Sequence, residues 1–143
     1  MSKLKVFCFG FGQVAESFVK KLILEKKDLD ISITSRKETH QIELYDLKIK
    51  SYLFNNDKFD RSIKEKIKDA HLILVSIPPI NGTDIVASYL DVNFENMKNC
   101  RWITYLSATS VYGDHHGDWV NEESITKPTS LNGINRLKAE NTW

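Results

Sequence analysis

The sequence predicts an α/β fold built on a doubly wound parallel sheet. Two observations carry this prediction. Apolar strand segments alternate with segments of helical pattern, an order that right-handed crossovers turn into a parallel sheet. A glycine-rich turn also joins the first strand to the first helix, which is typical of such sheets. The chain has 143 residues, enough to bury one core, so we interpret residues 1–143 as a single domain.

The first strand and the turn after it form the most informative stretch of the sequence. Val6–Phe9 is a continuous apolar run, as expected of a strand buried on both faces. Gly10, Gly12 and Ala15 then follow the spacing G-x-G-x-x-A and lead into a predicted helix, Gln13–Lys26. Gly10 would allow a tight turn, Gly12 a close approach of a diphosphate, and Ala15 close packing of helix on strand.

This motif predicts a dinucleotide site. The amides around Gly10, Gly12, Gln13 and Val14 would face the diphosphate, because the first turn of a helix favours an anion. Two alternatives stay open at this point. Glycine-rich turns also serve plain strand-to-helix connections, and methyl-donor enzymes use a similar turn.

The remaining elements alternate in the same way along the chain. Further strands are predicted at Leu29–Thr34, Ile49–Phe54, His71–Ile77 and Arg101–Leu106. Between them we predict a polar segment that could hold a helical turn (Thr39–Asp46), an amphipathic helix (Asp57–Lys68) and a helix with Thr83 as its N-cap (Thr83–Met97).

The ends of these strands supply the other predicted cofactor contacts. Arg36 follows the second strand, where a basic residue accommodates a 2′-phosphate, so it favours NADP over NAD; a merely solvated loop is the alternative. Pro78 and Pro79 terminate the fourth strand. We expect Ser76–Pro79 and Leu106–Ala108 to line the nicotinamide side, with His71 at the other end of its strand as a structural residue.

Composition limits the other partners. Lys and Arg number 20 against 19 Asp and Glu, so charge gives no argument for nucleic acid or an anionic membrane. Cys8 and Cys100 are expected to be buried free thiols, which suits a reducing cytoplasm. No segment approaches the ~20 apolar residues needed to span a bilayer, so we expect a soluble, cytoplasmic protein.

Two later motifs make a family resemblance specific. Leu106–Asp114 reads LSATSVYGD, and Pro128–Arg136 reads PTSLNGINR, followed by Ala139 and Glu140. With the glycine turn, they resemble the extended short-chain dehydrogenase/reductases, the NAD-dependent epimerase/dehydratase family, and in particular its atypical members. Those proteins have a Rossmann fold and carry S-x-x-V-Y-G and then P-x-S-x-Y-G-x-S-K. The resemblance covers the whole chain, from the glycine turn to a last helix beginning near Ser130.

The sequence departs from this family at its catalytic positions. The family's Ser or Thr, Tyr and Lys fall on Ala108, Asn132 and Arg136. In the family the Tyr exchanges a proton with the substrate while hydride moves to or from the nicotinamide. An amide does not titrate, and a guanidinium stays protonated. Asn132 and Arg136 are nevertheless four residues apart on one helix face and could jointly hold the ribose and the substrate.

The sequence therefore leaves two candidate functions. The first is an NAD(P)-dependent oxidoreductase or epimerase relative acting on a nucleotide sugar or a small carbonyl compound. The alternative is a non-catalytic NAD(P)-binding sensor or partner subunit. Full-length relatives continue into a smaller carboxyl-terminal substrate domain, so we expect this chain to be truncated before it, as a fragment or a shortened relative. An uncovered sheet edge would then favour a homodimer.

The loop after the fifth strand offers other groups for proton transfer. Tyr112 and the pair His115–His116 lie at the predicted carboxyl edge of the sheet, where ligands bind, although loop histidines are usually solvated. The same loop has acidic neighbours, but its close spacing is a weak ligand pattern, and we expect no metal. Trp102 and Trp119 are expected to pack against the protein.

Overall fold

The computed structural model describes residues 3–26 and 28–143, with the side chains of 92–94 excepted. The strands are β1 (Leu4–Phe9), β2 (Leu29–Ser35), β3 (His40–Leu44), β4 (Leu47–Leu53), β5 (Leu72–Val75) and β6 (Trp102–Tyr105). The helices are α1 (Gln13–Glu25), α2 (Ile63–Asp69), α3 (Ile85–Asn93) and α4 (Leu131–Thr142), with 3₁₀ turns η1 (Phe94–Asn96) and η2 (Thr109–Val111).

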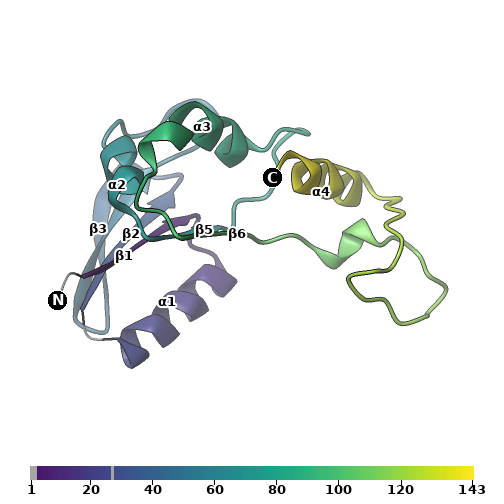
Figure 1. Cartoon of the computed structure of the whole chain (residues 1–143), viewed down its shortest axis with the longest axis horizontal. Coiled ribbons are helices and arrows are strands. Elements are labelled where there is room, and N and C mark those ends of the chain that lie inside the picture. The colour runs from purple at the N-terminus through teal and green to yellow at the C-terminus, as the bar shows by residue number, and fades with distance from the viewer. Residues whose placement is uncertain (1–2, 27) are drawn as a thin grey trace.

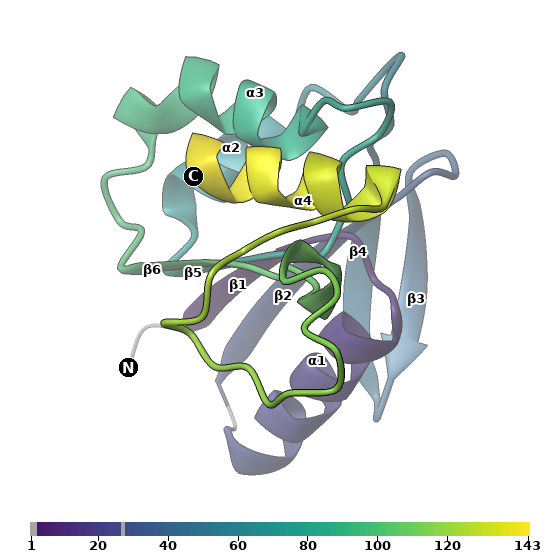
Figure 2. The same ribbon diagram turned by 90° about the vertical axis from the view of Figure 1, so that its right-hand side faces the viewer.

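One six-stranded sheet organises the molecule, with the strand order β3-β4-β2-β1-β5-β6. All neighbouring pairs are parallel except β3 with β4. Helix α1 covers one face, and α2, α3 and α4 lie on the other (Figures 1 and 2). Among the described residues, the model contains no helix with the length and apolar character that a bilayer crossing needs. The predicted doubly wound α/β architecture is confirmed.

Strand β1 contributes to both halves of the core. Val6 and Cys8 pack with α1, whereas Phe7 and Phe9 pack with the helices of the other face. All four side chains are buried, as the continuous apolar run predicts. Burial raises the pKa of the Cys8 thiol to about 12. Both cysteines are free, but Cys100 is only half-buried, so the expectation of two buried thiols is confirmed for Cys8 alone.

The segment Thr39–Asp46 corrects one prediction. It holds no helical turn, because its central part is strand β3, which pairs antiparallel with β4. Tyr45 and Asp46 have φ of +48° and +62° and form the two-residue hairpin turn between the strands. Positive φ at both positions matches the right-handed twist of paired strands. The polar letters of this segment reflect a strand with an exposed face at the edge of the sheet.

Two predicted helices begin later than expected. α2 starts at Ile63 instead of Asp57, because Phe59 forms a bridge with Phe54 and extends the chain there. Thr83 is not the N-cap of α3, since it forms a bridge with Ile80. Asp84 takes that role: its Oδ1 accepts the backbone N–H groups of residues 86 and 87, at 3.0 and 2.9 Å.

Candidate functional site

The glycine turn lies at the carboxyl end of β1, where the chain passes from the sheet to α1. Gly10 has φ of +88°, and a Cβ built on it would lie 2.7 Å from Ser76 Oγ and 3.0 Å from Ile77 Cγ1. Its N–H donates to Thr34 Oγ1 at 2.8 Å. Neither the backbone conformation nor the space admits another side chain, so the tight turn needs glycine here.

Gly12 meets the opposite condition. It is the N-cap of α1 in an extended conformation, with φ −82° and ψ −174°, and no side chain caps the helix. A Cβ built on Gly12 would meet nothing within 4 Å. The Glu16 N–H donates to the Gly12 carbonyl at 2.9 Å, whereas the amides before it lie at the helix start, where intrahelical acceptors are missing. Open space thus faces amides at the positive end of the helix dipole, which suits an anion.

The other residues predicted around the glycine turn lie either in the first turn of α1 or just after β5. Gln13 and Val14 are exposed in the first turn of α1, beside this open space, and Ala15 is fully buried under the helix. The Ser76 backbone N–H and Oγ both donate to the Phe9 carbonyl, at 2.9 and 3.1 Å. Ser76 therefore lies directly under the glycine turn, and the exposed Pro78 follows it.

Arg36 is exposed at the end of β2, on a loop that is tied to the segment before α2. Glu38 pairs with Lys58 at 2.8 Å, and Thr39 Oγ1 donates to Asp60 Oδ2 at 2.6 Å. Hydrogen bonds from Ser62 and then from Thr39 hold the pKa of Asp60 below its usual range. In residues 3–26 and 28–143, no ion pair involves Arg36. Its charge therefore stays available to a ligand.

The three positions that correspond to family catalytic residues lie near the carboxyl end of β6. Ala108 is half-buried before η2, and Asn132 is exposed in the first turn of α4. Arg136 Nη1 donates to the Leu106 carbonyl at 2.7 Å and to the Tyr105 hydroxyl at 3.2 Å. The guanidinium thus joins α4 to the end of β6. These hydrogen bonds are made to the protein itself, whereas the sequence suggested that Arg136 and Asn132 could hold a ligand together.

A second bond between these elements was missed from the sequence. Ser107 Oγ donates a short hydrogen bond to the Glu140 carboxylate. Glu140 lies four residues after Arg136, so both side chains reach β6 from one face of α4. That spacing was the available signal, because the resemblance already placed Glu140 on the same helix.

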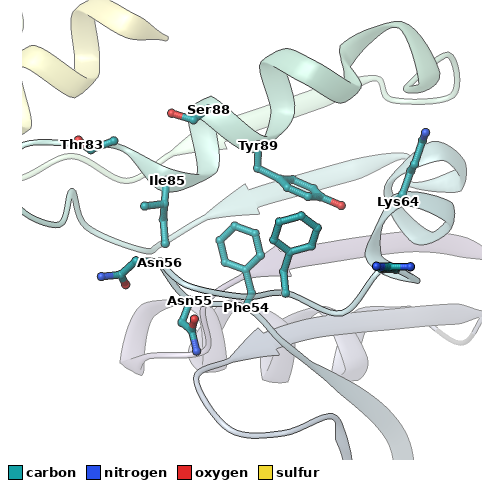
Figure 3. Close-up of a pocket in the computed structure, with 10 residues that line it drawn as sticks. Phe54, Asn55, Asn56, Lys64, Thr83, Ile85, Ser88 and Tyr89 are labelled. Atoms are coloured by element: carbon teal, nitrogen blue, oxygen red, sulfur yellow. The ribbon is translucent and has the colours of Figure 1, made fainter.

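A pocket of about 620 Å³, which we call the aromatic pocket, opens between the carboxyl end of β4 and α3 (Figure 3). It is lined by aromatic rings, amides, two cations and smaller side chains: Phe54, Asn55, Asn56, Phe59, Arg61, Lys64, Thr83, Ile85, Ser88 and Tyr89. It was not predicted from the sequence, because Tyr89 on α3 is far along the chain from Phe54 and Phe59. The available signal was the pair Phe54 and Phe59 after the third predicted strand.

The floor of this pocket continues the core below the glycine turn. Phe54 contacts Phe9 with ring centroids 5.2 Å apart, and Phe9 directly precedes Gly10. The Tyr89 ring lies 5.4 Å from Phe54 and 4.9 Å from Phe59, both edge to face. Burial, with a smaller contribution from the Asp60 charge, raises the pKa of Tyr89 to about 12. Tyr89 is therefore neutral at physiological pH.

The loop between η2 and α4 carries the groups considered above for proton transfer, and its hydrogen bonds are largely internal to the loop. His115 Nε2 lies 3.1 Å from the carbonyl oxygens of both Tyr112 and Ile125, so the ring closes the loop on itself. The Asp114 carboxylate accepts the His116 N–H at 2.7 Å. Trp119 is fully exposed, so the prediction that it packs is wrong. Trp102 is half-exposed beside Phe18, with 6.4 Å between ring centroids.

His71, expected to be structural, ties β1 to β5: its Nδ1 accepts the Lys5 N–H at 3.1 Å, and its own N–H donates to the Lys5 carbonyl at 2.9 Å. Both bonds lie at the edge of the sheet opposite the glycine turn. This expectation is confirmed.

Comparisons with known proteins agree with this architecture. No protein-family model and no curated protein matches the sequence. Among solved structures, a functionally unknown conserved protein from Silicibacter pomeroyi matches 96% of this chain and 46% of its own, with 27% identity and a TM-score of 0.74. A short-chain dehydrogenase/reductase superfamily protein from Agrobacterium tumefaciens with bound NAD matches 96% of this chain and 43% of its own, with 11% identity and a TM-score of 0.65.

A third solved structure is the UDP-glucuronic acid 4-epimerase from Bacillus cereus in complex with NAD. It matches 96% of this chain and 50% of its own, with 14% identity and a TM-score of 0.63. The chain thus spans about half the length of the structures it matches. The chain shares the Rossmann fold of these structures.

Proposed function

We propose that this protein binds a nicotinamide dinucleotide at the carboxyl edge of its sheet. The diphosphate lies on the amides of Gly12, Gln13 and Val14, at the start of α1. The observation that carries the proposal is the contrast within one turn: Gly10 is sterically obligatory, whereas Gly12 opens onto free space. The NAD-bound structures from Agrobacterium tumefaciens and Bacillus cereus, which share the fold, support it.

The two halves of the dinucleotide then extend in opposite directions along the edge. The adenosine half runs towards β2, where the exposed Arg36 favours the 2′-phosphate of NADP. The nicotinamide half runs towards β5 and β6, past Ser76, Pro78 and the segment from Leu106 to Ala108. This direction follows from the position of β1 between β2 and β5, where the chain turns back across the sheet.

The first candidate activity is oxidoreductase or epimerase chemistry on a nucleotide sugar or a small carbonyl compound. The bound dinucleotide would supply hydride transfer. Asn132, exposed at the start of α4, would orient a substrate by hydrogen bonding without exchanging a proton. Arg136 would position Tyr105 and the end of β6.

The second candidate is an NAD(P)-binding sensor or partner subunit without turnover. A specific observation favours it: Ala108 and Asn132 cannot titrate, and the Arg136 guanidinium is already bonded to β6. Both candidates need the same dinucleotide site. Two assays separate them. Incubation with NADPH and carbonyl compounds, followed by absorbance at 340 nm, detects a reductase, because each turnover oxidises one cofactor. Incubation with NAD and nucleotide sugars, followed by NMR analysis of the sugar, detects an epimerase, which returns the hydride and leaves the cofactor unchanged overall; a sensor or partner subunit shows neither.

The binding proposal is tested with Gly12→Asp. Aspartate is a favoured N-cap and places a negative charge at the positive end of α1, so the free energy of unfolding should stay equal or rise by up to about 1 kcal/mol. The same carboxylate would occupy the space assigned to the diphosphate. Fluorescence titration with NADPH and NADH should therefore show binding to the wild type and at least tenfold weaker binding to the variant.

Gly12→Ser is the matched control, since it caps the helix without charge and should retain more of the affinity. Equal dinucleotide affinities for the wild type and Gly12→Asp would contradict the proposal. So would a wild type that binds neither dinucleotide.

A further inference from the structure

We propose that Arg61 and Lys64, at the rim of the aromatic pocket, bind a phosphate carried by an adenosine whose base lies against the aromatic floor. They would thereby determine the preference for a phosphorylated dinucleotide together with Arg36. This inference rests on the proposed function, since it concerns the adenosine half of the same ligand. Both residues lie in the segment predicted as the amphipathic helix Asp57–Lys68.

The floor of the pocket suits a planar base. Phe54, Phe59 and Tyr89 contact one another through their rings, and Figure 3 shows Tyr89 reaching down from α3 towards Phe54. Aromatic faces stack on any base, because every base has a π-face. The volume of about 620 Å³ is within the range of pockets for small ligands and exceeds what a base alone needs.

The polar side chains that line the pocket offer more hydrogen-bond donors than acceptors. Asn55 Oδ1 already accepts the N–H groups of Asp57 and Lys58, both at 2.9 Å, which leaves its NH₂ group as a donor. Arg61 and Lys64 are donors only. Among the described residues that line the pocket there is no Asp or Glu. Such a surface suits a ligand rich in acceptor oxygens, as a phosphate is.

The charged side chains that line the pocket carry one sign. Arg61 and Lys64 are both exposed, and within residues 3–26 and 28–143 neither takes part in an ion pair. Of the acidic side chains on the neighbouring loops, Glu38 pairs with Lys58, and Asp60, which accepts from Thr39 and Ser62, lies outside the lining. The charges on the lining itself are thus positive.

The same bonds place this rim on the side of the dinucleotide site. The bonds Glu38–Lys58 and Thr39–Asp60 hold the loop that begins at Arg36 against the segment that ends just before Arg61. A ribose phosphate presented to Arg36 at the end of β2 therefore lies towards the rim. Two guanidinium groups and one ammonium would share its oxygens, a charge-assisted arrangement stronger than neutral hydrogen bonds.

The test compares phosphorylated and unphosphorylated ligands in Arg61→Gln/Lys64→Gln. The matched control, Lys66→Gln/Lys68→Gln, removes the same charge from α2 outside the pocket lining. Isothermal titration calorimetry would use NADPH, NADH, 2′,5′-ADP and AMP. We expect the rim variant to bind NADPH and 2′,5′-ADP at least tenfold more weakly than the wild type, with NADH and AMP changed less than twofold. The control should stay within twofold for all four ligands.

An unchanged NADPH affinity in the rim variant, or equal losses for NADPH and NADH, would overturn this inference while leaving the dinucleotide site intact. Wild-type binding of 2′,5′-ADP that depends on the rim, without binding of either dinucleotide, would support the inference and contradict the proposed function. A wild type that binds none of the four ligands would overturn both. Matching thermal unfolding curves would show that the variants are folded.

Discussion

Gly10 and Gly12 belong to one turn but are constrained in different ways. The fold itself requires glycine at position 10, since φ is +88° there and a Cβ would overlap Ser76. The fold does not require glycine at position 12, because the conformation suits any N-cap residue and the surroundings are open. The spacing of the motif could be recognised in the sequence. Which glycine serves the fold and which serves a ligand required the surrounding atoms.

Gly10→Ala should therefore destabilise the protein. The left-handed conformation costs a non-glycine residue about 1–3 kcal/mol, and the overlap with Ser76 Oγ adds to this. Urea denaturation followed by circular dichroism measures the change. Ser76→Ala in the Gly10→Ala background should recover only the part due to overlap. A Gly10→Ala variant as stable as the wild type would show that the turn is not built as described.

Arg136 shows what a sequence motif leaves open at this scale. Its position four residues after Asn132 was correctly placed on one helix. The direction of its side chain was not predictable, because it depends on the Tyr105 hydroxyl and the Leu106 carbonyl across the interface with β6. The prediction for Trp119 was wrong for a related reason. Its apolar character predicts burial, but the loop that carries it extends away from the core, to the far right in Figure 1.

Among the elements, those with strong apolar patterns were predicted best. β1 and β5 are short apolar runs, and β2 is rich in β-branched residues; the existence and order of all three followed from the sequence. β3 was missed because an edge strand with exposed polar residues resembles a polar loop. The start of α2 was misplaced because Phe59 fits a helical period with Ile63 but actually bridges to Phe54.

Helix α4 depends on a close approach that only glycine allows. A Cβ on Gly133 would lie 2.4 Å from the Ser110 carbonyl oxygen and 3.0 Å from Pro128 Cβ. Helix propensity alone predicts that Gly133→Ala stabilises the protein by up to about 1 kcal/mol. The overlap with backbone should reverse this sign and give a net loss of about 1–2 kcal/mol, because overpacking costs about 1–3 kcal/mol.

Chemical denaturation would measure this loss, with Asn141→Ala on the exposed side of α4 as the control, expected within about 0.5 kcal/mol of the wild type. Fluorescence adds a local readout. Trp143 stacks on Tyr105 at 5.7 Å between ring centroids, and its Nε1 donates to Asp84 at 2.9 Å. With Trp102 and Trp119 replaced by Phe, a red-shifted emission in Gly133→Ala would report α4 leaving β6. A stabilised variant with unchanged emission would refute the close approach.

At the scale of the whole molecule, the fold brings the predicted contacts to one edge. The parallel strands follow the order β4-β2-β1-β5-β6, so the chain leaves β1 in one direction for β2 and later returns on its other side with β5. The glycine turn and Ser76 lie where these two halves diverge, and β6 follows one strand further along the sheet (Figure 2). This convergence was predictable, because it depends on the order of elements and the handedness of crossovers. The aromatic pocket was not, since it depends on how α3 packs over Phe54 and Phe59.

The most direct measurement of the central claim is an amide chemical-shift titration of ¹⁵N-labelled protein with NADPH. We expect saturable shifts that are largest for Gly12, Gln13 and Val14, with Arg36 as a second centre and the end of α4 at Asn141 and Thr142 unaffected. Shifts absent from the start of α1, or confined to the exposed loop around Trp119, would contradict the claim that this turn holds a dinucleotide.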